Sequence, residues 1–64
     1  MSKQLYIVEI WDDSSNYFVV HSKHRNEDHA LINFEVVAKS KKVHTRVIYK
    51  GLIIASSLGT KHGF

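Results

Sequence analysis

Residues 26–40 read NEDHALINFEVVAKS, and this is the only stretch of the chain whose pattern is typical of a helix. Asn26 is a good N-cap, because its side-chain oxygen can accept hydrogen bonds from the backbone N–H groups of the first turn. Acidic residues follow the cap and lysines stand at the other end, so both ends complement the helix dipole. At about 100° per residue, one face is apolar and is expected to pack on a sheet: Ala30, Leu31, Phe34, Val37 and Ala38.

Two aliphatic residues of the same helix lie away from this apolar stripe. Ile32 and Val36 are one turn apart, beside His29 and Ser40. Small proteins routinely expose single aliphatic side chains, which is the simpler interpretation. The other interpretation is a contact patch for a partner or for a second copy of the chain. Both stay open at the level of the sequence.

Length and composition indicate one small domain. Sixty-four residues are few for a self-sufficient core, and the absence of cysteine rules out disulfides and thiolate zinc sites. The apolar runs are far shorter than the ~20 residues that span a membrane. The segment MSKQLYIVEIW lacks the features of a signal peptide, so we expect a cytoplasmic protein. A net charge of +3 permits contact with nucleic acid or an acidic protein surface and requires neither.

The residues before the helix predict a β-hairpin. Residues 4–11 (QLYIVEIW) and 16–22 (NYFVVHS) are rich in β-branched and aromatic residues, and turn-forming residues separate them. A five-residue loop gives a core face of Tyr6, Val8, Ile10, Phe18 and Val20. A four-residue loop instead places Tyr17, Val19 and His21 on the core face. We favour the five-residue loop, because it leaves Tyr17 and His21 on the open side.

The residues after the helix predict a second hairpin. Residues 43–50 (VHTRVIYK) alternate between the two faces, Lys50–Gly51 suits a tight turn, and residues 52–57 (LIIASS) form the return strand. The expected fold is therefore an α+β, two-layer ββαββ domain over residues 1–57, an antiparallel sheet with one helix on one face. Residues 58–64 are expected to form a fraying tail.

With one helix, only one face of the sheet is covered. The outward set then mixes aromatic, aliphatic and cationic side chains: Leu5, Ile7, Trp11, Tyr17, Val19, His21, His44, Arg46, Ile48 and Lys50. Such a surface suits a protein partner or stacked bases. The plainer interpretation is that the open face of a small sheet is simply half apolar.

The sequence gives little support for a metal site, a catalytic site or a phosphate-binding loop. His21, His24 and His29 lie close in sequence but on three different kinds of element, and no fourth ligand suggests itself, so we expect no metal site and no cofactor. Ser14, Ser15 and Asp13 are expected to be turn residues, not catalytic ones. The three glycines are scattered and make no phosphate-binding loop. We expect no enzymatic activity.

The strongest electrostatic feature is a basic strip of Lys39, Lys41, Lys42 and Arg46. Lysines at this place complement the helix C-terminus, which is sufficient to explain them. As a phosphate-contacting strip they would act together with Lys23 and Arg25 if the fold brought the two groups together. The chain contains no RNP motif, helix-turn-helix pair or zinc finger.

The succession LYIVEIW, NYFVVHS, NEDHALINFEVVAKS and VHTRVIYKGLIIASS resembles in layout the small ββαβ or ββαββ proteins that bacteriophages make against host machinery. An early coliphage inhibitor of bacterial RNA polymerase, anti-CRISPR proteins that block the type I surveillance complex and a phage antitoxin are similar in layout. The local likeness lies in Asp28–Leu31 at the helix start and Thr45–Val47 in the following strand. The basic charge departs from the acidic polymerase inhibitor. The resemblance implies an inhibitor that acts by occupying a surface of a host complex.

Three functional hypotheses follow. The first is a non-catalytic phage-type protein that binds a host protein or protein–nucleic-acid complex in the host cytoplasm. The second is direct nucleic-acid binding through the basic strip and the open sheet face. The third is a homodimer formed through Ile32 and Val36, as opposed to a monomer. The expected partner-binding residues are Trp11, Tyr17, His44, Arg46, Ile48, Lys50, Ile32 and Val36.

Overall fold

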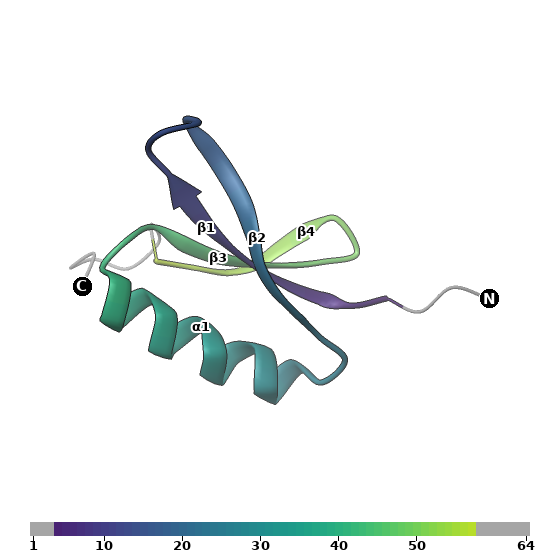
Figure 1. Cartoon of the computed structure of the whole chain (residues 1–64). Helices are drawn as coiled ribbons and strands as arrows, with labels where there is room; N and C mark the ends of the chain where they lie inside the picture. The colour runs from purple at the N-terminus through teal and green to yellow at the C-terminus, as the bar shows by residue number, and fades with distance from the viewer. Residues whose placement is uncertain (1–3, 58–64) are drawn as a thin grey trace.

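The computed structural model describes residues 4–57, which form four strands and one helix. In chain order these are β1 (Tyr6–Asp12), β2 (Tyr17–His24), α1 (Glu27–Lys41), β3 (Thr45–Tyr49) and β4 (Leu52–Ser56). The strands make one antiparallel sheet in the order β2-β1-β3-β4, and α1 lies along one face of it (Figure 1). The expected two-layer α+β fold is confirmed. The tail predicted over residues 58–64 lies outside the described residues.

Local hydrogen bonds close both ends of α1, and the cap at the first end is the one that the sequence predicts. The side chain of Asn26 accepts hydrogen bonds from the backbone N–H groups of Asp28 at 2.7 Å and His29 at 3.2 Å. At the other end, Lys42 adopts the left-handed conformation with a φ of 54°, and its N–H bonds to the carbonyl of Ala38. Local residues therefore determine where the helix that covers the sheet begins and ends.

The core lies between α1 and the two central strands. Val8 of β1, Val47 of β3 and Ala30 of α1 have no solvent exposure, and partly buried hydrophobic residues surround them: Tyr6, Leu31, Phe34 and Ala55. The predicted apolar stripe of α1 is thus confirmed as the side that meets the sheet. Because the fully buried side chains are small, the helix can approach the sheet closely.

Two tyrosine rings from adjacent strands extend this core. The rings of Tyr6 and Tyr49 stack with their centroids 3.9 Å apart and an interplanar angle of 6°. Burial, together with the hydrogen bond to Tyr49, raises the pKa of the Tyr6 hydroxyl above its usual value of 10.0. The stack lies on the side of the sheet that α1 covers.

The preferred register of the first hairpin is wrong. Asp12 pairs with Tyr17, so the loop has four residues, and Trp11 pairs with Phe18 and Glu9 with Val20. Phe18 and Val20 therefore lie on the uncovered face, whereas Tyr17 and Val19 lie on the face of Ile10 and Val8, which α1 covers.

The reason for this register is the chemistry of the turn. The Asp12 carboxylate accepts hydrogen bonds from the Ser14 backbone N–H and hydroxyl and from the Ser15 hydroxyl, and the Asn16 N–H bonds to the Asp12 carbonyl at 2.7 Å. Asn16 supplies the positive φ, 68°, that closes so short a loop.

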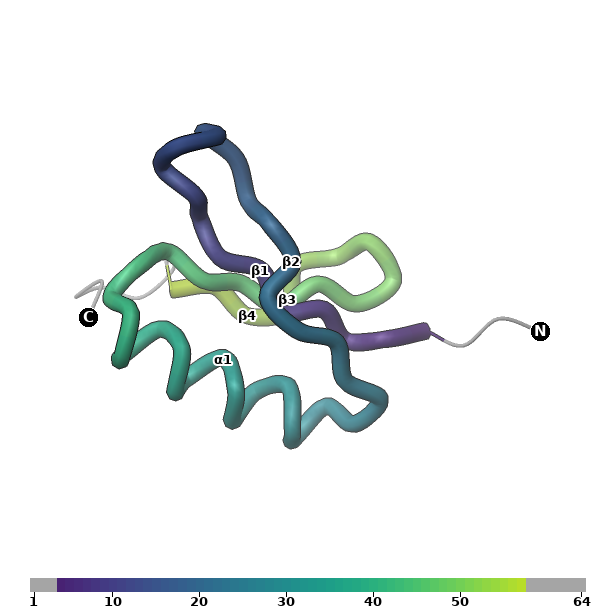
Figure 2. Tube along the Cα trace, in the orientation of Figure 1, coloured from purple at the N-terminus to yellow at the C-terminus, as the bar shows by residue number. Residues whose placement is uncertain are grey.

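A β-bulge in β2 then changes the face of the sheet to which the following side chains point. Val8 pairs with Ser22 and Glu9 with Val20, so His21 is the extra residue between them and is not part of a regular outward row. After the bulge, Ser22 and His24 return to the side of α1. The hairpin consequently bends, and its tip projects away from the helix (Figure 2).

The second hairpin agrees with the sequence. Lys50 and Gly51 form its two-residue turn with φ values of 54° and 77°, as a type I′ turn requires. At its base, the buried backbone N–H of Thr45 donates to the Ser57 hydroxyl at 2.9 Å. A second register shift falls in β4 at Ile54, because Val47 pairs with Ala55 and Ile48 with Ile53.

Candidate binding surface on the uncovered sheet face

The face of the sheet opposite α1 has no other described element over it (Figure 1). Cross-strand partners in an antiparallel pair point to the same side, so the strand register identifies the side chains on this face. They come from all four strands: Ile7, Glu9, Trp11, Phe18, Val20, Lys23, Arg46, Ile48, Ile53 and Ser56. We refer to this set as the uncovered face.

Arg46 is fixed at the centre of the uncovered face by two contacts. Its Nε donates a hydrogen bond to Glu9 Oε1 at 2.7 Å, and its guanidinium carbon lies 3.9 Å from the centroid of the Phe18 ring. Only 29% of the Arg46 side chain and 18% of the Glu9 side chain are exposed. The charge-assisted hydrogen bond and the cation–π contact together restrict the rotamers of a normally flexible side chain.

Trp11 is held beside this pair. Its ring meets that of Phe18 edge to face, with centroids 5.3 Å apart and an interplanar angle of 77°. Its indole N–H donates to Asp13 Oδ1 at 2.8 Å, and its backbone N–H donates to the His44 carbonyl at 2.8 Å. Glu9, Trp11, Phe18 and Arg46 thus form one group of mutually oriented side chains, here named the Arg46 cluster.

Aliphatic side chains border the Arg46 cluster. Val20, opposite Glu9, is 53% exposed, and Ile53, opposite Ile48, is 56% exposed. Ile7 and Ile48, between them, are half-buried. The aromatic and arginine residues of this centre are types that are enriched in protein-binding surfaces.

The structure brings together four of the residues that the sequence selects. Trp11, Arg46 and Ile48 share the uncovered face, and His44 lies beside Trp11. Trp11 and His44 also border a shallow hollow of about 170 Å³, together with Asp13, Lys42 and Val43.

Two of the selected residues lie elsewhere. Tyr17 is exposed at the hairpin tip, but it shares the side of Asp12 and not that of Trp11. Lys50 belongs to the turn of the second hairpin, where its Nζ lies 5.4 Å from the centroid of the Tyr49 ring. Neither residue joins the Arg46 cluster.

The basic strip does not form one surface. Lys39 and Lys41 lie in the last turn of α1 and Lys42 caps it, whereas Arg46 points to the opposite face of the sheet and bonds Glu9. The cationic residues are thus divided between the two layers of the molecule.

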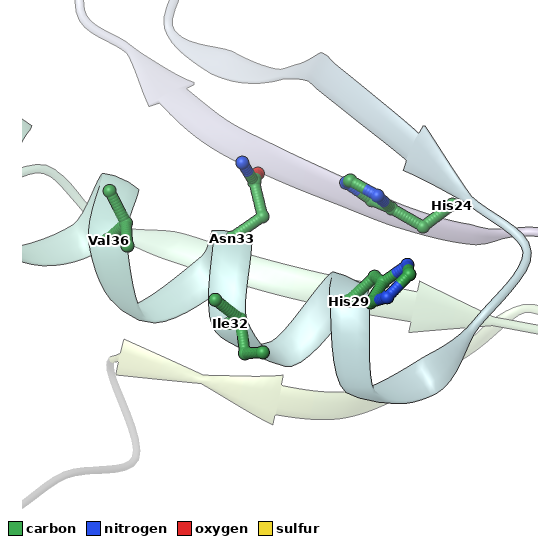
Figure 3. A pocket seen from close by; sticks show the side chains of 5 residues that line it. All are labelled: His24, His29, Ile32, Asn33 and Val36. Atoms are coloured by element: carbon green, nitrogen blue, oxygen red, sulfur yellow. The ribbon is translucent and has the colours of Figure 1, made fainter.

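Ile32 and Val36 form a separate exposed region on α1. A shallow groove of about 350 Å³ is lined by His24, His29, Ile32, Asn33 and Val36, with His24 facing His29 from the end of β2 (Figure 3). The Ser22 hydroxyl donates to Asn33 Oδ1 at 2.9 Å and lies 2.9 Å from His24 Nε2, which ties β2 to α1. Over residues 4–57, no three histidine or acidic side chains are grouped so that they could hold a metal ion.

Searches against family models, curated proteins and solved structures found nothing that matches this chain. In the described part of the chain, the helix is neither long nor apolar enough to cross a membrane.

Proposed function

We propose that this chain is a small, non-catalytic binding protein that occupies the surface of a larger protein assembly through its uncovered face. The observation that carries the proposal is the Arg46 cluster, which presents Trp11, Phe18 and Arg46 side by side without a covering element among the described residues. Trp and Arg are enriched at the energetic centres of protein interfaces. Because their mutual contacts already restrict their rotamers, ordering them on binding costs little entropy.

The charges on the uncovered face favour a protein over a nucleic acid. Arg46 already bonds Glu9, so a phosphate group would have to compete with that carboxylate. Asp13, which holds the Trp11 indole, adds a second acidic group near the aromatic rings. Surfaces that bind single strands combine aromatic rings with a positively charged groove. On the uncovered face, Lys23 is the one lysine beside the paired Arg46 among the described strand residues, and the lysines of α1 lie on the other layer.

The resemblance in layout to phage proteins that act on host complexes supports the same mode of action. Such a protein blocks a path or a conformational step by covering a surface, without chemistry of its own. On this proposal the chain acts in the cytoplasm of a bacterial host, and suitable targets are RNA polymerase or a CRISPR surveillance complex.

The test is affinity capture from bacterial lysate, with and without nuclease, read by mass spectrometry. One double variant, Val20→Ser with Ile53→Ser, removes the exposed aliphatic border of the uncovered face. The control, Leu52→Ser, makes the same kind of change at an exposed aliphatic position on β4 that lies outside the uncovered face. Circular dichroism of all three proteins establishes that they are equally folded.

We expect the wild type and the Leu52→Ser control to retain the same host complex after nuclease treatment, and the uncovered-face variant to lose most of it. Retention of broad, nuclease-sensitive material would overturn the proposal in favour of nucleic-acid binding. Equal capture by the uncovered-face variant and the Leu52→Ser control would show that the partner binds a different surface.

A further inference from the structure

The outermost surface of α1 carries two exposed aliphatic side chains. Ile32 is 62% exposed and Val36 is 58% exposed. At about 100° per residue, the pair lies almost diametrically opposite the stripe that contacts the sheet. They follow one another along the helix at the edge of the groove in Figure 3. Figure 1 shows no other described element packed against the side of α1 that faces away from the sheet, and His24, at the end of β2, borders the groove beside the pair.

Charged and polar residues flank this pair in a defined arrangement. On the same helical projection, Asp28 and Lys39 lie to one side of Ile32, and His29 and Ser40 lie to the other side, beyond Val36. All four flanking residues are exposed. The acidic group thus stands near the helix N-terminus and the basic group near the C-terminus, on the same side of the aliphatic pair.

This arrangement is complementary to itself when two helices run antiparallel. A two-fold axis perpendicular to both helices, level with Asn33 and Phe34, sets Ile32 of each copy against Val36 of the other. Asp28 lies about 6 Å before Ile32 along the helix, and Lys39 lies about 4.5 Å beyond Val36. The same axis therefore sets Asp28 of one copy level with Lys39 of the other to within about 1.5 Å.

The symmetry also preserves the side on which each group stands. A two-fold axis normal to the plane of the two helices keeps residues above that plane above it, so Asp28 and Lys39 meet on one side. His29 and Ser40 meet on the other side in the same way. Antiparallel helix dipoles oppose one another favourably as well.

We propose that this face of α1 is a homodimer interface, in which two copies of the chain pack their helices antiparallel through Ile32 and Val36 with two Asp28–Lys39 ion pairs across the seam. A single helix face makes a small contact, below the ~1,200 Å² of standard interfaces, so the dimer is weak. The uncovered sheet faces point outward from both copies. The dimer consequently carries two Arg46 clusters, and the inference does not depend on the function proposed for them.

The first experiment is sedimentation velocity of the full chain from roughly 10 μM to 1 mM, the range of weak interfaces. We expect the wild type to approach the dimer mass as concentration rises. Ile32→Glu places a carboxylate in the seam and should hold the protein at the monomer mass. Leu52→Glu, the same change at an equally exposed aliphatic residue on β4, should leave the dimer intact. A wild type that stays monomeric at the highest concentration overturns the proposal.

Charge reversal tests the register of the seam. Asp28→Lys alone brings lysine against lysine in the homodimer, and Lys39→Glu alone brings acid against acid, so each variant should dimerise about tenfold more weakly. Mixed together, the two variants restore both opposite-charge pairs and should form a heterodimer. Dimerisation of each single variant at wild-type strength, or a mixture no tighter than its components, would contradict the antiparallel register.

A third variant should act in the opposite direction. Glu35 lies on the Asp28 side of the seam, close to the two-fold axis, so the two copies bring their Glu35 side chains near one another. Glu35→Gln removes this repulsion and should tighten the dimer roughly twofold. A weaker Glu35→Gln dimer would place the axis elsewhere and overturn the proposed register.

Discussion

The side chains on the two faces of the sheet are held in place by different kinds of contact. On the covered face, Val8 and Val47 are fully buried against Ala30, and small side chains let the helix come close. On the uncovered face, large side chains are held by contacts within the sheet itself, an ion pair and two aromatic contacts. Hydrophobic burial fixes one face, and mutual polar and aromatic contacts preorganise the other.

The largest expected effect separates the two faces with one chemical change. Val8→Ala removes two methyl groups from the centre of the core and should lower the free energy of unfolding by about 2 kcal/mol. Val20→Ala, on the exposed border, should change it by less than about 0.5 kcal/mol. Urea unfolding followed by circular dichroism measures both. Equal losses of unfolding free energy in the two variants would mean that Val20 is packed as tightly as Val8 in the core.

A smaller effect should appear within the Arg46 cluster. A double-mutant cycle of Arg46→Ala and Phe18→Ala should give a coupling of roughly 0.5–1 kcal/mol in unfolding free energy, the value of a partly exposed cation–π contact. Arg46→Lys serves as the control, because it keeps a positive charge near Glu9 but cannot form the Nε hydrogen bond. Additive losses would show that the two side chains do not hold one another.

The smallest effect concerns the turn that assigns Phe18 and Val20 to the uncovered face. Hydrogen bonds from Ser15 and Ser14 lower the pKa of Asp12 below its ordinary value of 3.8. A lowered pKa contributes stability above the unfolded-state value, and this contribution is lost as the pH falls through the folded-state value. The difference in Tm between the wild type and Asp12→Asn should therefore shrink as the pH falls below about 4. A difference independent of pH would contradict the role of the Asp12 carboxylate.

Much of the fold was predictable because local residues determine it. Asn26 caps α1, the apolar stripe of α1 meets the sheet, and Lys50–Gly51 turns the second hairpin, each as the sequence indicates. Contacts within a few residues decide the cap and the turn, and the apolar periodicity of the helix decides which of its sides meets the sheet. The order of the elements could be predicted from these features. Because that order contains one helix, it also predicts that one face of the sheet is uncovered.

The composition of the uncovered face was not predictable in the same way. The loop length of the first hairpin depends on the hydrogen bonds that Asp12 collects, and an alternation of apolar residues fits either register. No local sequence pattern indicates the bulge at His21, so the sequence does not predict that the side chains beyond it point to the opposite face of the sheet. Phe18 was therefore assigned to the core, although it supports Arg46. The serines after Asp12 were the available indication of the four-residue loop.

Trp11 reports directly on whether the uncovered face is the binding surface, because it is the single tryptophan of the chain. The measurement is acrylamide quenching of Trp11 fluorescence in the free protein and in complex with the host assembly captured from lysate, after exchange of that assembly's tryptophans for non-fluorescent analogues. If the partner covers the uncovered face, the quenching constant should fall severalfold on binding. An unchanged constant in a fully formed complex would show that the partner contacts another part of the molecule.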